Sequence, residues 1–322
     1  MSADGSISAR AIVTTDLVSE ASRLQGLGQL AAAALGRALT CSLLIAEGLK
    51  DDESFQVKFD GDGPLRGVTA MGNGKLESRG FVGNPAVTLP PNALGKIDVG
   101  GGVGKGALNV LRTKMLPGET SPSQYSSITQ IRSGEIPEDI NFYLLESEQK
   151  EGALAAGVYV QGTQATDAGV GAESAAGGTE PGVCAAVTAA GGWYVQLLPF
   201  AAEESIERLS TNLEAMKTYS PTSMVRDGLT AQGMLERVLE GLEPQFSELR
   251  TPKGLAESCP CSEERVLRTL SLLPKSELAE IIKSNDVVEA KCEFCGTMYR
   301  KTAADIEAEL DARKERDERE GY

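Results

Sequence analysis

The chain has 322 residues, of which 41% are hydrophobic, which is enough for one domain with a sizeable core and a second, smaller domain. Its formal net charge of −15 disfavours a nucleic-acid partner, because proteins bind phosphates mainly through Lys and Arg. No uninterrupted apolar run reaches eighteen residues and no secretory signal opens the chain, so we expect neither a membrane protein nor a secreted one.

Residues before position 100 predict core helices followed by an antiparallel meander. Residues 1–10 are small and polar, and we expect them to form a mobile end. An apolar stretch at 11–17 predicts a strand, and the Ala/Leu-rich segment from Ser19 to Lys50 predicts one or two helices. Alternating apolar and polar residues at 54–60 are typical of a half-buried strand.

Later apolar runs complete an α+β fold in which antiparallel sheets pack on helices. The glycine-rich segment Gly100–Gly106 does not match a phosphate-binding loop, which would require Gly at position 99 and Ser or Thr at position 106. The chain has Val99 and Gly106 there, so we expect a flexible loop. Residues 163–182 are rich in Gly, Ala, Ser and Thr and predict a floppy insertion. Strands are expected at 54–60, 65–71, 75–82, 107–113, 125–131, 153–160, 183–189 and 192–198, and a helix at 133–149.

A separate helical region is predicted at 201–251, where apolar residues recur at helical spacing in two stripes. Ordinary core packing explains such stripes, but the region lies between the α+β domain and a cysteine-rich module, so its apolar faces must cover something. The stripes consist of Ile206, Leu209, Leu213 and Met216, and of Met234, Leu235, Val238, Leu239 and Leu242.

Four cysteines near the C-terminus form a C-x-C pair, Cys259 and Cys261, and a C-x-x-C pair, Cys292 and Cys295. Each short pair places two sulfurs within reach of one ion, and four thiolates suit a tetrahedral Zn²⁺. The chain has no histidine, which excludes mixed Cys/His zinc sites and every His-dependent hydrolase triad. We therefore predict one Cys₄ zinc site in the reduced protein. Two disulfides of a secreted protein, or thiols buried in a core, are the alternatives.

The remaining cysteines, Cys41 and Cys184, lie in apolar surroundings and are expected to be buried as small hydrophobic residues. Six cysteines without a secretory signal indicate a reducing compartment. Zinc ribbons often bind nucleic acids, but from Lys253 onward the chain carries 12 basic and 16 acidic residues, so no nucleic-acid partner is expected.

Helices and one strand are expected around the cysteine pairs. A helix from Ser262 is interrupted by Pro274, and Ser276 begins a second helix. Residues 287–291 lead into the second cysteine pair, and 302–310 are expected to be helical. The last residues, from 311, mix both charges and predict a solvated end.

The two cysteine pairs and their neighbours carry a resemblance to a known family. The stretches 259–266 and 287–299 resemble the zinc module of the heat-shock protein 33 family, which consists of redox-regulated holdase chaperones. Landmarks of that family's core domain are matched in the expected order, so the resemblance covers nearly the whole chain. These landmarks are Gly61–Leu65, Val103–Gly106, Ser147–Gln149 and Gly191–Pro199.

The resemblance implies a chaperone core domain at 1–200, a metastable helical linker at 201–251 that folds back on the core, and a zinc-binding redox-switch domain at 252–322. The thiols within each short pair are neighbours, which makes Cys259–Cys261 and Cys292–Cys295 the expected disulfides after oxidation, and the family implies the same pairs. Oxidation is then expected to eject the zinc, release the linker and expose apolar surface that holds unfolded or aggregation-prone client proteins without ATP.

The resemblance also implies a cytoplasmic protein of the heat-shock and oxidative-stress response, which dimerises with a second copy when oxidised and is reset by thiol-reducing systems. An organellar stroma is the alternative compartment. The alternative function is a zinc-stapled scaffold protein that binds one defined partner independently of redox state. A thiol oxidoreductase is disfavoured, because a catalytic C-x-x-C is expected at the start of a helix in a thioredoxin-like unit. We expect no enzymatic activity.

Overall fold

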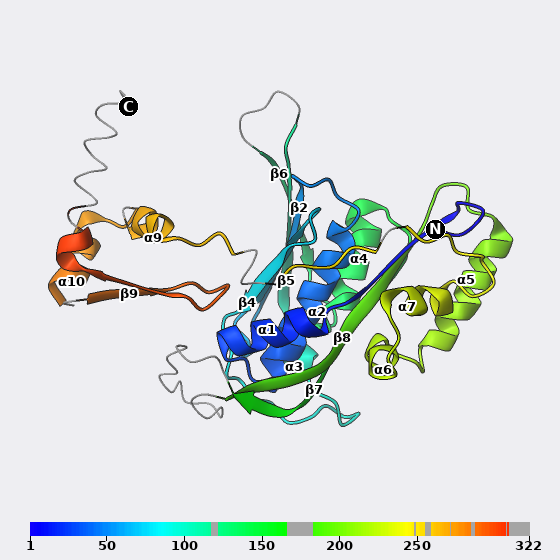
Figure 1. Cartoon of the computed structure of the whole chain (residues 1–322), viewed down its shortest axis with the longest axis horizontal. Helices are drawn as coiled ribbons and strands as arrows, with labels where there is room; N and C mark the ends of the chain where they lie inside the picture. Colours follow the sequence, from blue (N-terminus) through cyan, green and yellow to red (C-terminus); the bar gives the residue numbers. More distant parts are fainter. Residues whose placement is uncertain are drawn as a thin grey trace. The chain divides into compact units, whose positions relative to one another are not determined.

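A long apolar helix, α2 (Gln29–Ala46), lies at the centre of the fold of this computed structural model (Figure 1). Ala and Leu occupy most of its positions, and it is buried along nearly its whole length. Within the described part of the chain, α2 alone is long and apolar enough to cross a membrane, but 89% of it is buried inside the protein. It therefore packs as a core helix.

The structure describes residues 1–116, 122–165, 183–247, 249–254, 259–270, 272–284, 287–306 and 308. The chain divides into two units, Met1–Ser258 and Cys259–Tyr322. The helical region expected at 201–251 falls within the first unit.

A five-stranded antiparallel sheet with strand order β4-β3-β2-β5-β6 packs on α2. Phe55, Val57 and Phe59 on β2 are fully buried, whereas the residues between them are not. This alternation is the period-two pattern that the sequence predicts for the strand. The strands are β2 (Ser54–Gly61), β3 (Val68–Asn73), β4 (Ser78–Val82), β5 (Gly106–Lys114) and β6 (Ser123–Gln130).

A second antiparallel sheet has three strands, in the order β1-β8-β7. The long strand β8 (Val183–Leu197) pairs with β1 (Ile7–Val13) on one side and with β7 (Gly152–Ala165) on the other. Tyr194 of β8 packs in the core around α2, while its neighbours Trp193 and Val195 belong to a different apolar cluster. Because neighbouring residues of a strand point to opposite faces, this sheet is buried on both faces.

Helices cover both faces of the three-stranded sheet, as Figure 1 shows. One face packs on α2 and on α1 (Thr15–Gln25). The other face packs on three helices from the region after β8, which we call the linker helices. These are α5 (Glu203–Met216), α6 (Pro221–Arg226) and α7 (Ala231–Val238).

The N-terminal end differs from the prediction. The first strand occupies Ile7–Val13 instead of 11–17, and α1 already begins at Thr15. Residues 1–10, expected to be mobile, include part of this strand and a buried Ser2. The Ala/Leu-rich segment forms two helices because Gly26, with a left-handed φ of 66°, ends α1.

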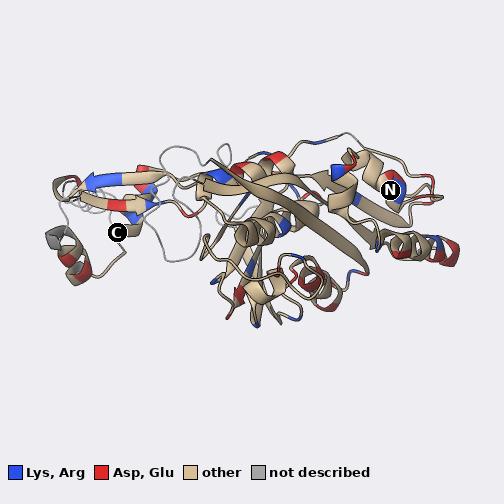
Figure 2. Cartoon of the chain, turned by 90° about the horizontal axis from the view of Figure 1, so that it is seen from below, with Lys and Arg blue, Asp and Glu red and all other residues tan. Residues whose placement is uncertain are grey.

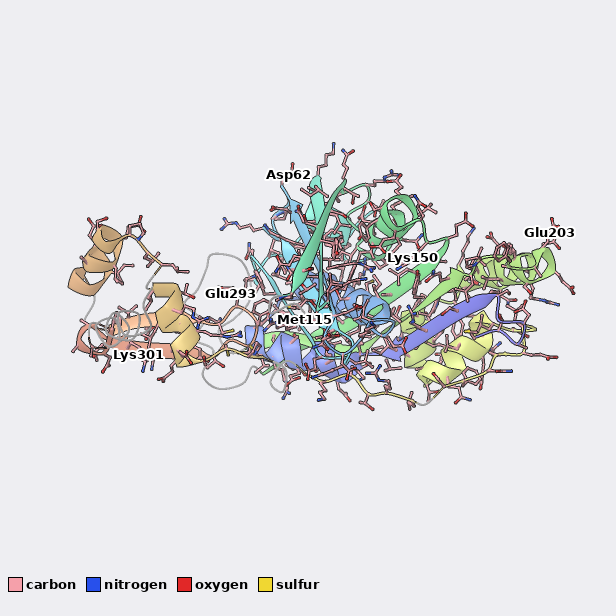
Figure 3. All side chains as sticks on the ribbon, turned by 90° about the horizontal axis from the view of Figure 1, so that it is seen from above. Asp62, Met115, Lys150, Glu203, Glu293 and Lys301 are labelled. Atoms are coloured by element: carbon pink, nitrogen blue, oxygen red, sulfur yellow. The ribbon has the colours of Figure 1, made fainter. Side chains whose placement is uncertain are left out.

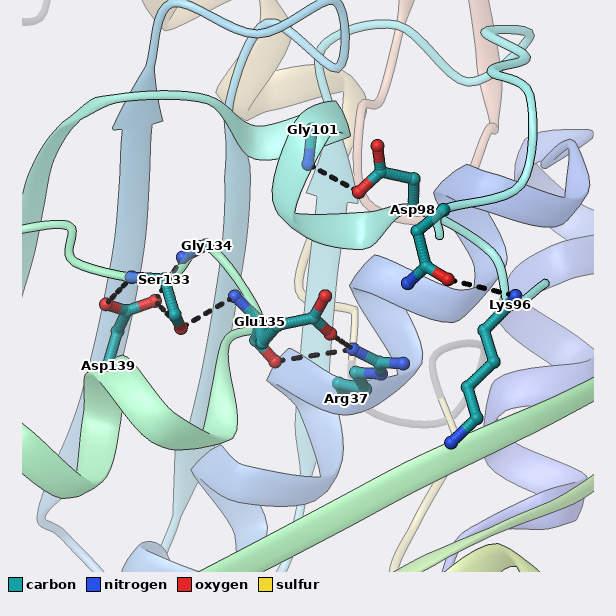
Figure 4. A network of polar contacts seen from close by, with 9 residues as sticks. Arg37, Lys96, Asp98, Gly101, Ser133, Gly134, Glu135 and Asp139 are labelled. Carbon is teal, nitrogen blue, oxygen red and sulfur yellow. Dashed lines mark hydrogen bonds and ion pairs between the residues drawn. The ribbon is translucent and has the colours of Figure 1, made fainter. Parts of the chain in front are cut away.

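Two glycine-rich stretches are more regular than expected. Strand β8 runs without a break through Gly191 and Gly192, where the sequence analysis separates two strands. The stretch Gly100–Gly106, expected to be a flexible loop, overlaps the short helix α3 (Val99–Val103). Its cap, Asp98, accepts a hydrogen bond from the Gly101 amide (Figure 4).

The helix predicted at 133–149 begins later, at Pro137, and forms α4 (Pro137–Glu148). The carboxylate of Asp139 folds the preceding loop, because it accepts hydrogen bonds from the amides of Arg132, Ser133 and Gly134 (Figure 4). Strand β7 extends to Ala165 and so takes up the start of the predicted insertion. Residues 166–182 of that insertion lie outside the described residues.

In its described residues, the second unit contains the helices α9 and α10, a two-stranded antiparallel sheet and a short helical segment after the sheet. Its buried apolar residues, within the described residues, are Leu278, Cys295 and Ile306, and α9 has no buried residue. A unit with so small an apolar core needs another source of stability. Residues 303–306 are helical, as expected, and the end from 311 lies outside the described residues. The elements are α9 (Glu263–Leu270), α10 (Lys275–Ser284), β9 (Val287–Lys291) and β10 (Met298–Thr302).

Candidate metal centre and linker interface

The second unit brings the four cysteines of the two short pairs together. Cys259 and Cys261 directly precede α9, and Cys292 and Cys295 lie in the turn between β9 and β10. The four sulfur atoms lie within 4.8 Å of one another. Two of these distances join the two pairs, with 3.8 Å from the Sγ of Cys259 to that of Cys292 and 3.3 Å from the Sγ of Cys261 to that of Cys295.

The geometry of the four sulfurs fits a tetrahedral metal ion. Zinc–sulfur bonds measure about 2.3 Å, so two sulfurs of a tetrahedral zinc site lie about 3.8 Å apart. The four thiols are free, since a disulfide would require sulfurs about 2.05 Å apart. All four are at least half-buried, and a closed set of four thiolates is typical of structural zinc. The four cysteines can therefore hold a metal ion, as the sequence predicts.

The turn that presents the second pair is fixed by the backbone. The amide of Gly296 donates to the carbonyl of Cys292, and the amide of Cys292 donates to the carbonyl of Thr297. Gly296 adopts a left-handed φ of 74°, a conformation that favours glycine. The turn between β9 and β10 thus holds Cys292 and Cys295 close together.

Two hydroxyl groups contact the sulfurs from β10 and its approach. The hydroxyl oxygen of Thr297 lies 3.1 Å from the Sγ of Cys295, and the hydroxyl of Tyr299 is hydrogen-bonded to Cys261. Desolvation opposes ionisation of Cys295, but hydrogen bonds led by the Thr297 hydroxyl lower its pKa to about 7. Burial raises the pKa values of Cys259 and Cys292. Cys295 therefore ionises more readily near neutral pH than Cys259 or Cys292.

The linker helices cover an apolar surface on the first unit. Their apolar faces and the outer face of the three-stranded sheet form one buried group, which we call the docking cluster. Helix α6 packs on β7 and β8, and α7 packs on β1. The docking cluster consists of Ile7, Trp193, Val195, Leu209, Met224, Met234, Val238, Leu239 and Leu242.

A pair of glycines lets α6 lie close to the sheet. Gly157 of β7 and Gly191 of β8 are directly opposite each other in the strand register. A Cβ atom at Gly157 would lie 2.9 Å from the Cγ2 of Thr222, and one at Gly191 would lie 3.0 Å from the Cγ2 of Val225. Both distances are shorter than ordinary van der Waals contact, so side chains at these positions would push α6 away from the sheet.

The N-terminal segment contacts both ends of the linker helices. Asp4 accepts a hydrogen bond from Ser205 on α5, at 2.7 Å. The amide of Ala3 donates to the carbonyl of Leu242, beyond α7, at 3.1 Å. Hydroxyl groups of Ser2, Ser6 and Ser205 donate to Asp4 and hold its pKa well below the usual range. The segment therefore ties the linker helices to β1.

The two cysteines outside the group of four lie in the apolar core of the first unit. Cys41 and Cys184 are fully buried, as expected, and burial raises the pKa of Cys41. Figure 2 shows Lys and Arg interspersed with Asp and Glu in this view, rather than collected into a basic face. Glu203, labelled in Figure 3, begins the acidic first turn of α5.

Several residues that shape these sites could not be identified from the sequence alone. Thr297 and Tyr299 follow the second cysteine pair, but their hydroxyl contacts depend on the turn between β9 and β10. Asn212 is a polar residue within the first apolar stripe of the linker, and this break in the stripe is a signal that its amide has a buried partner. No sequence motif around Gly157 indicates its close contact with α6.

Comparison with known proteins is consistent across sequence and structure. A family described as Hsp33 protein matches residues 1–302. The 33 kDa chaperonin of Acaryochloris marina is 38% identical over 94% of this chain and 91% of its own length, and that of Symbiobacterium thermophilum is 38% identical over 92% and 91%. The crystal structure of the 33 kDa chaperonin of Thermotoga maritima, a heat shock protein 33 homolog, aligns with a TM-score of 0.79 at 29% identity and covers 97% of this chain and 96% of that one. This chain therefore belongs to the Hsp33 family, whose members are chaperones and not enzymes.

Proposed function

We propose that this protein is a redox-regulated holdase, a chaperone that binds unfolded proteins without ATP after its cysteines are oxidised. The docking cluster carries the proposal, because one chain combines a group of four oxidisable thiols with helices that cover an apolar sheet face. A protein that only needed a zinc staple would not require a covered apolar surface elsewhere in the chain.

In the reduced state, Cys259, Cys261, Cys292 and Cys295 would hold one Zn²⁺ as thiolates. The ion would supply the crosslink that the small apolar core of the second unit lacks. Structural zinc in small domains contributes about 10–16 kcal/mol of apparent binding free energy, which exceeds or matches the whole stability of about 5–15 kcal/mol typical of a domain. We therefore expect the second unit to unfold when its cysteines can no longer bind the metal.

Oxidation removes the ligands. Each pair of thiolates gives two electrons to the oxidant, a sulfur–sulfur bond forms, and neither sulfur remains available as a thiolate ligand. We propose the disulfides Cys259–Cys261 and Cys292–Cys295. Sulfur atoms of different pairs also lie close together, Cys259 with Cys292 and Cys261 with Cys295, so peptide mapping of the oxidised protein is needed to distinguish the pairings.

Loss of the folded second unit would then destabilise the linker, whose C-terminal continuation is held to the core by the hydrogen bonds of Arg250 and Lys253 to the carbonyls of Gly74 and Leu76. Release of α5, α6 and α7 would uncover Trp193, Val195 and the rest of the docking cluster. Unfolded or aggregation-prone clients would bind this surface and the freed apolar helix faces by the hydrophobic effect, without ATP.

Further parts of the proposal concern assembly, recovery and compartment. We propose that the oxidised protein is a homodimer and that thiol-reducing systems restore the reduced state. A reducing compartment such as the cytoplasm suits a zinc–thiolate switch, and an organellar stroma is the alternative. Each of these statements is separable from the holdase activity and can be tested by sedimentation, by reductase coupling and by localisation.

The test compares reduced and peroxide-treated protein at mild heat. Zinc release is followed with a chromogenic chelator while light scattering reports the aggregation of a thermally unfolding client. We expect one zinc per chain to be released as suppression of aggregation develops. Retention of zinc, or release of zinc without suppression, would contradict the proposal and would favour the alternative of a zinc-stapled scaffold with one defined partner.

A further inference from the structure

The linker interface is rich in methionine. The chain contains seven methionines. Each linker helix carries one of them: Met216 is on α5, Met224 on α6 and Met234 on α7. Met224 and Met234 are fully buried in the docking cluster, and Met216 is packed against it. Thioether sulfur is, after the thiolate, the side-chain group that peroxide and hypochlorous acid oxidise most readily in proteins.

We propose that Met224 and Met234 are oxidation sites that keep the linker helices off the sheet after the thiols have been reduced again. This inference rests on the proposed function, because the two sulfurs become accessible only when the linker helices leave the docking cluster. In the docked state their side chains have no exposed surface, so oxidation of the cysteines must come first.

The reaction is an oxygen transfer. A lone pair of the methionine sulfur attacks one oxygen of hydrogen peroxide, and the oxygen–oxygen bond breaks. The departing hydroxide takes the proton of the transferred hydroxyl and leaves as water. The sulfur is oxidised by two electrons and becomes a sulfoxide, and the peroxide is reduced. Thiol reductants that open disulfides leave the sulfoxide in place, because its return to the thioether requires a methionine sulfoxide reductase.

A sulfoxide does not fit the docked state. The docking cluster consists of apolar side chains from the sheet and the linker helices, and a buried polar group without a hydrogen-bond partner is strongly destabilising. The indole Nε1 of Trp193 is a buried donor without a partner among the described residues. It can satisfy at most one sulfoxide oxygen, so oxidation at both methionines leaves at least one oxygen without this donor.

The first experiment measures whether the linker docks again. Zinc-loaded full-length protein is oxidised with peroxide, then reduced with dithiothreitol in the presence of zinc, and the emission of Trp193 is recorded at each step. Trp193 is the single tryptophan of the chain and lies in the docking cluster, so its emission reports solvent access to that surface. Peptide mass spectrometry measures the sulfoxide at each methionine.

The matched control carries Leu at positions 216, 224 and 234, a change of similar volume that apolar cores tolerate. We expect the wild type to keep a red-shifted Trp193 emission after thiol reduction, in proportion to the sulfoxide at Met224 and Met234, whereas the Leu variant returns to the docked spectrum. Equal recovery of both proteins would overturn the inference while leaving the proposed function intact. If peroxide never shifts the emission of Trp193, the linker stays docked, and both the inference and the proposed function fail.

A second experiment needs no oxidant. Met224→Gln and Met234→Gln place a polar group of similar length in the docking cluster of the reduced, zinc-loaded protein. We expect the rate at which a limiting protease cleaves the linker to rise roughly tenfold or more in the double variant. A tenfold rise requires the free energy of linker docking to fall by slightly more than the net contribution of one hydrogen bond. Met115→Gln is the control, because Met115 follows β5, is exposed and lies outside the docking cluster (labelled in Figure 3). Equal cleavage of the double variant and the control would overturn the inference.

Discussion

The hydrogen bonds of Asn212 provide a direct way to loosen the linker without changing a cysteine. Asn212 lies on α5 and is 8% exposed. Its side-chain amide donates to the backbone carbonyls of Val238, at 3.0 Å, and Glu240, at 2.9 Å. Val238 is the last residue of α7 and Glu240 follows the helix by two residues, so the side chain of Asn212 ties α5 to the end of α7 within the linker.

The substitution Asn212→Ala removes both hydrogen bonds. Each contributes about 1 kcal/mol net, and the loss of both corresponds to about 2 kcal/mol. If the linker helices leave the sheet in the same step in which α5 separates from α7, this loss raises the population of undocked linker by about 30-fold. We therefore expect reduced, zinc-loaded Asn212→Ala protein to suppress client aggregation measurably, whereas the reduced wild type does not.

The assay combines light scattering of an unfolding client with Trp193 emission and zinc content, all under reducing conditions. Ser210→Ala is the control, because Ser210 lies on the same helix and its hydroxyl donates only to the exposed carbonyl of Ile206 one turn earlier. The reasoning is wrong if Asn212→Ala keeps its zinc and is no more active than Ser210→Ala. It is also wrong if activity appears while the Trp193 spectrum stays that of the docked protein.

Three further predictions follow from contacts around the two sites. Thr297→Val removes the hydroxyl beside Cys295, so the sulfur becomes more nucleophilic. We expect peroxide to release zinc about fivefold faster, because the lost hydrogen bond contributes about 1 kcal/mol. Unchanged release kinetics would contradict this prediction. Asp4 has a lowered pKa in the folded protein, so its contribution to linker docking is complete above pH about 4 and is lost as the pH falls through the lowered value. Asp4→Asn should therefore speed proteolysis of the linker at neutral pH, and a difference from wild type that persists unchanged below pH about 4 would refute the assignment. Gly157→Ala should push α6 off the sheet and raise the Trp193 emission wavelength, and adding Thr222→Ala should restore the docked spectrum because it removes the clashing methyl group.

Local sequence patterns predicted most of the sheet and the central helices. Phe55, Val57 and Phe59 alternate with polar residues, so burial of one strand face follows from the sequence. The first strand was placed too late, because Ala9 and Ala11 give β1 a weak alternating pattern and its stability comes from pairing with β8, about 180 residues away in the chain. The unbroken course of β8 through Gly191 and Gly192 was missed for a related reason, since Gly191 serves the close approach of α6 and Gly192 lies close against β7, and neither forms a turn.

The grouping of the four cysteines was predicted better than the linker interface. Four cysteines in two short pairs restrict the site almost by themselves, and the structure brings all four sulfurs together. The apolar stripes of the linker predicted buried helix faces but not their partner, because nothing in the local sequence of α7 indicates that it packs on β1. Contacts between distant segments, such as Asp4 with Ser205, leave no periodic signal.

The most direct test of the central claim is amide hydrogen exchange of the linker helices before and after oxidation. The account predicts that the amides of α5 and α7 are protected in the reduced, zinc-loaded protein and exchange rapidly once zinc has been released, while β2 and β5 stay protected. Continued protection of α5 and α7 in zinc-free, oxidised protein that holds clients would contradict the account, because client binding would then use another surface.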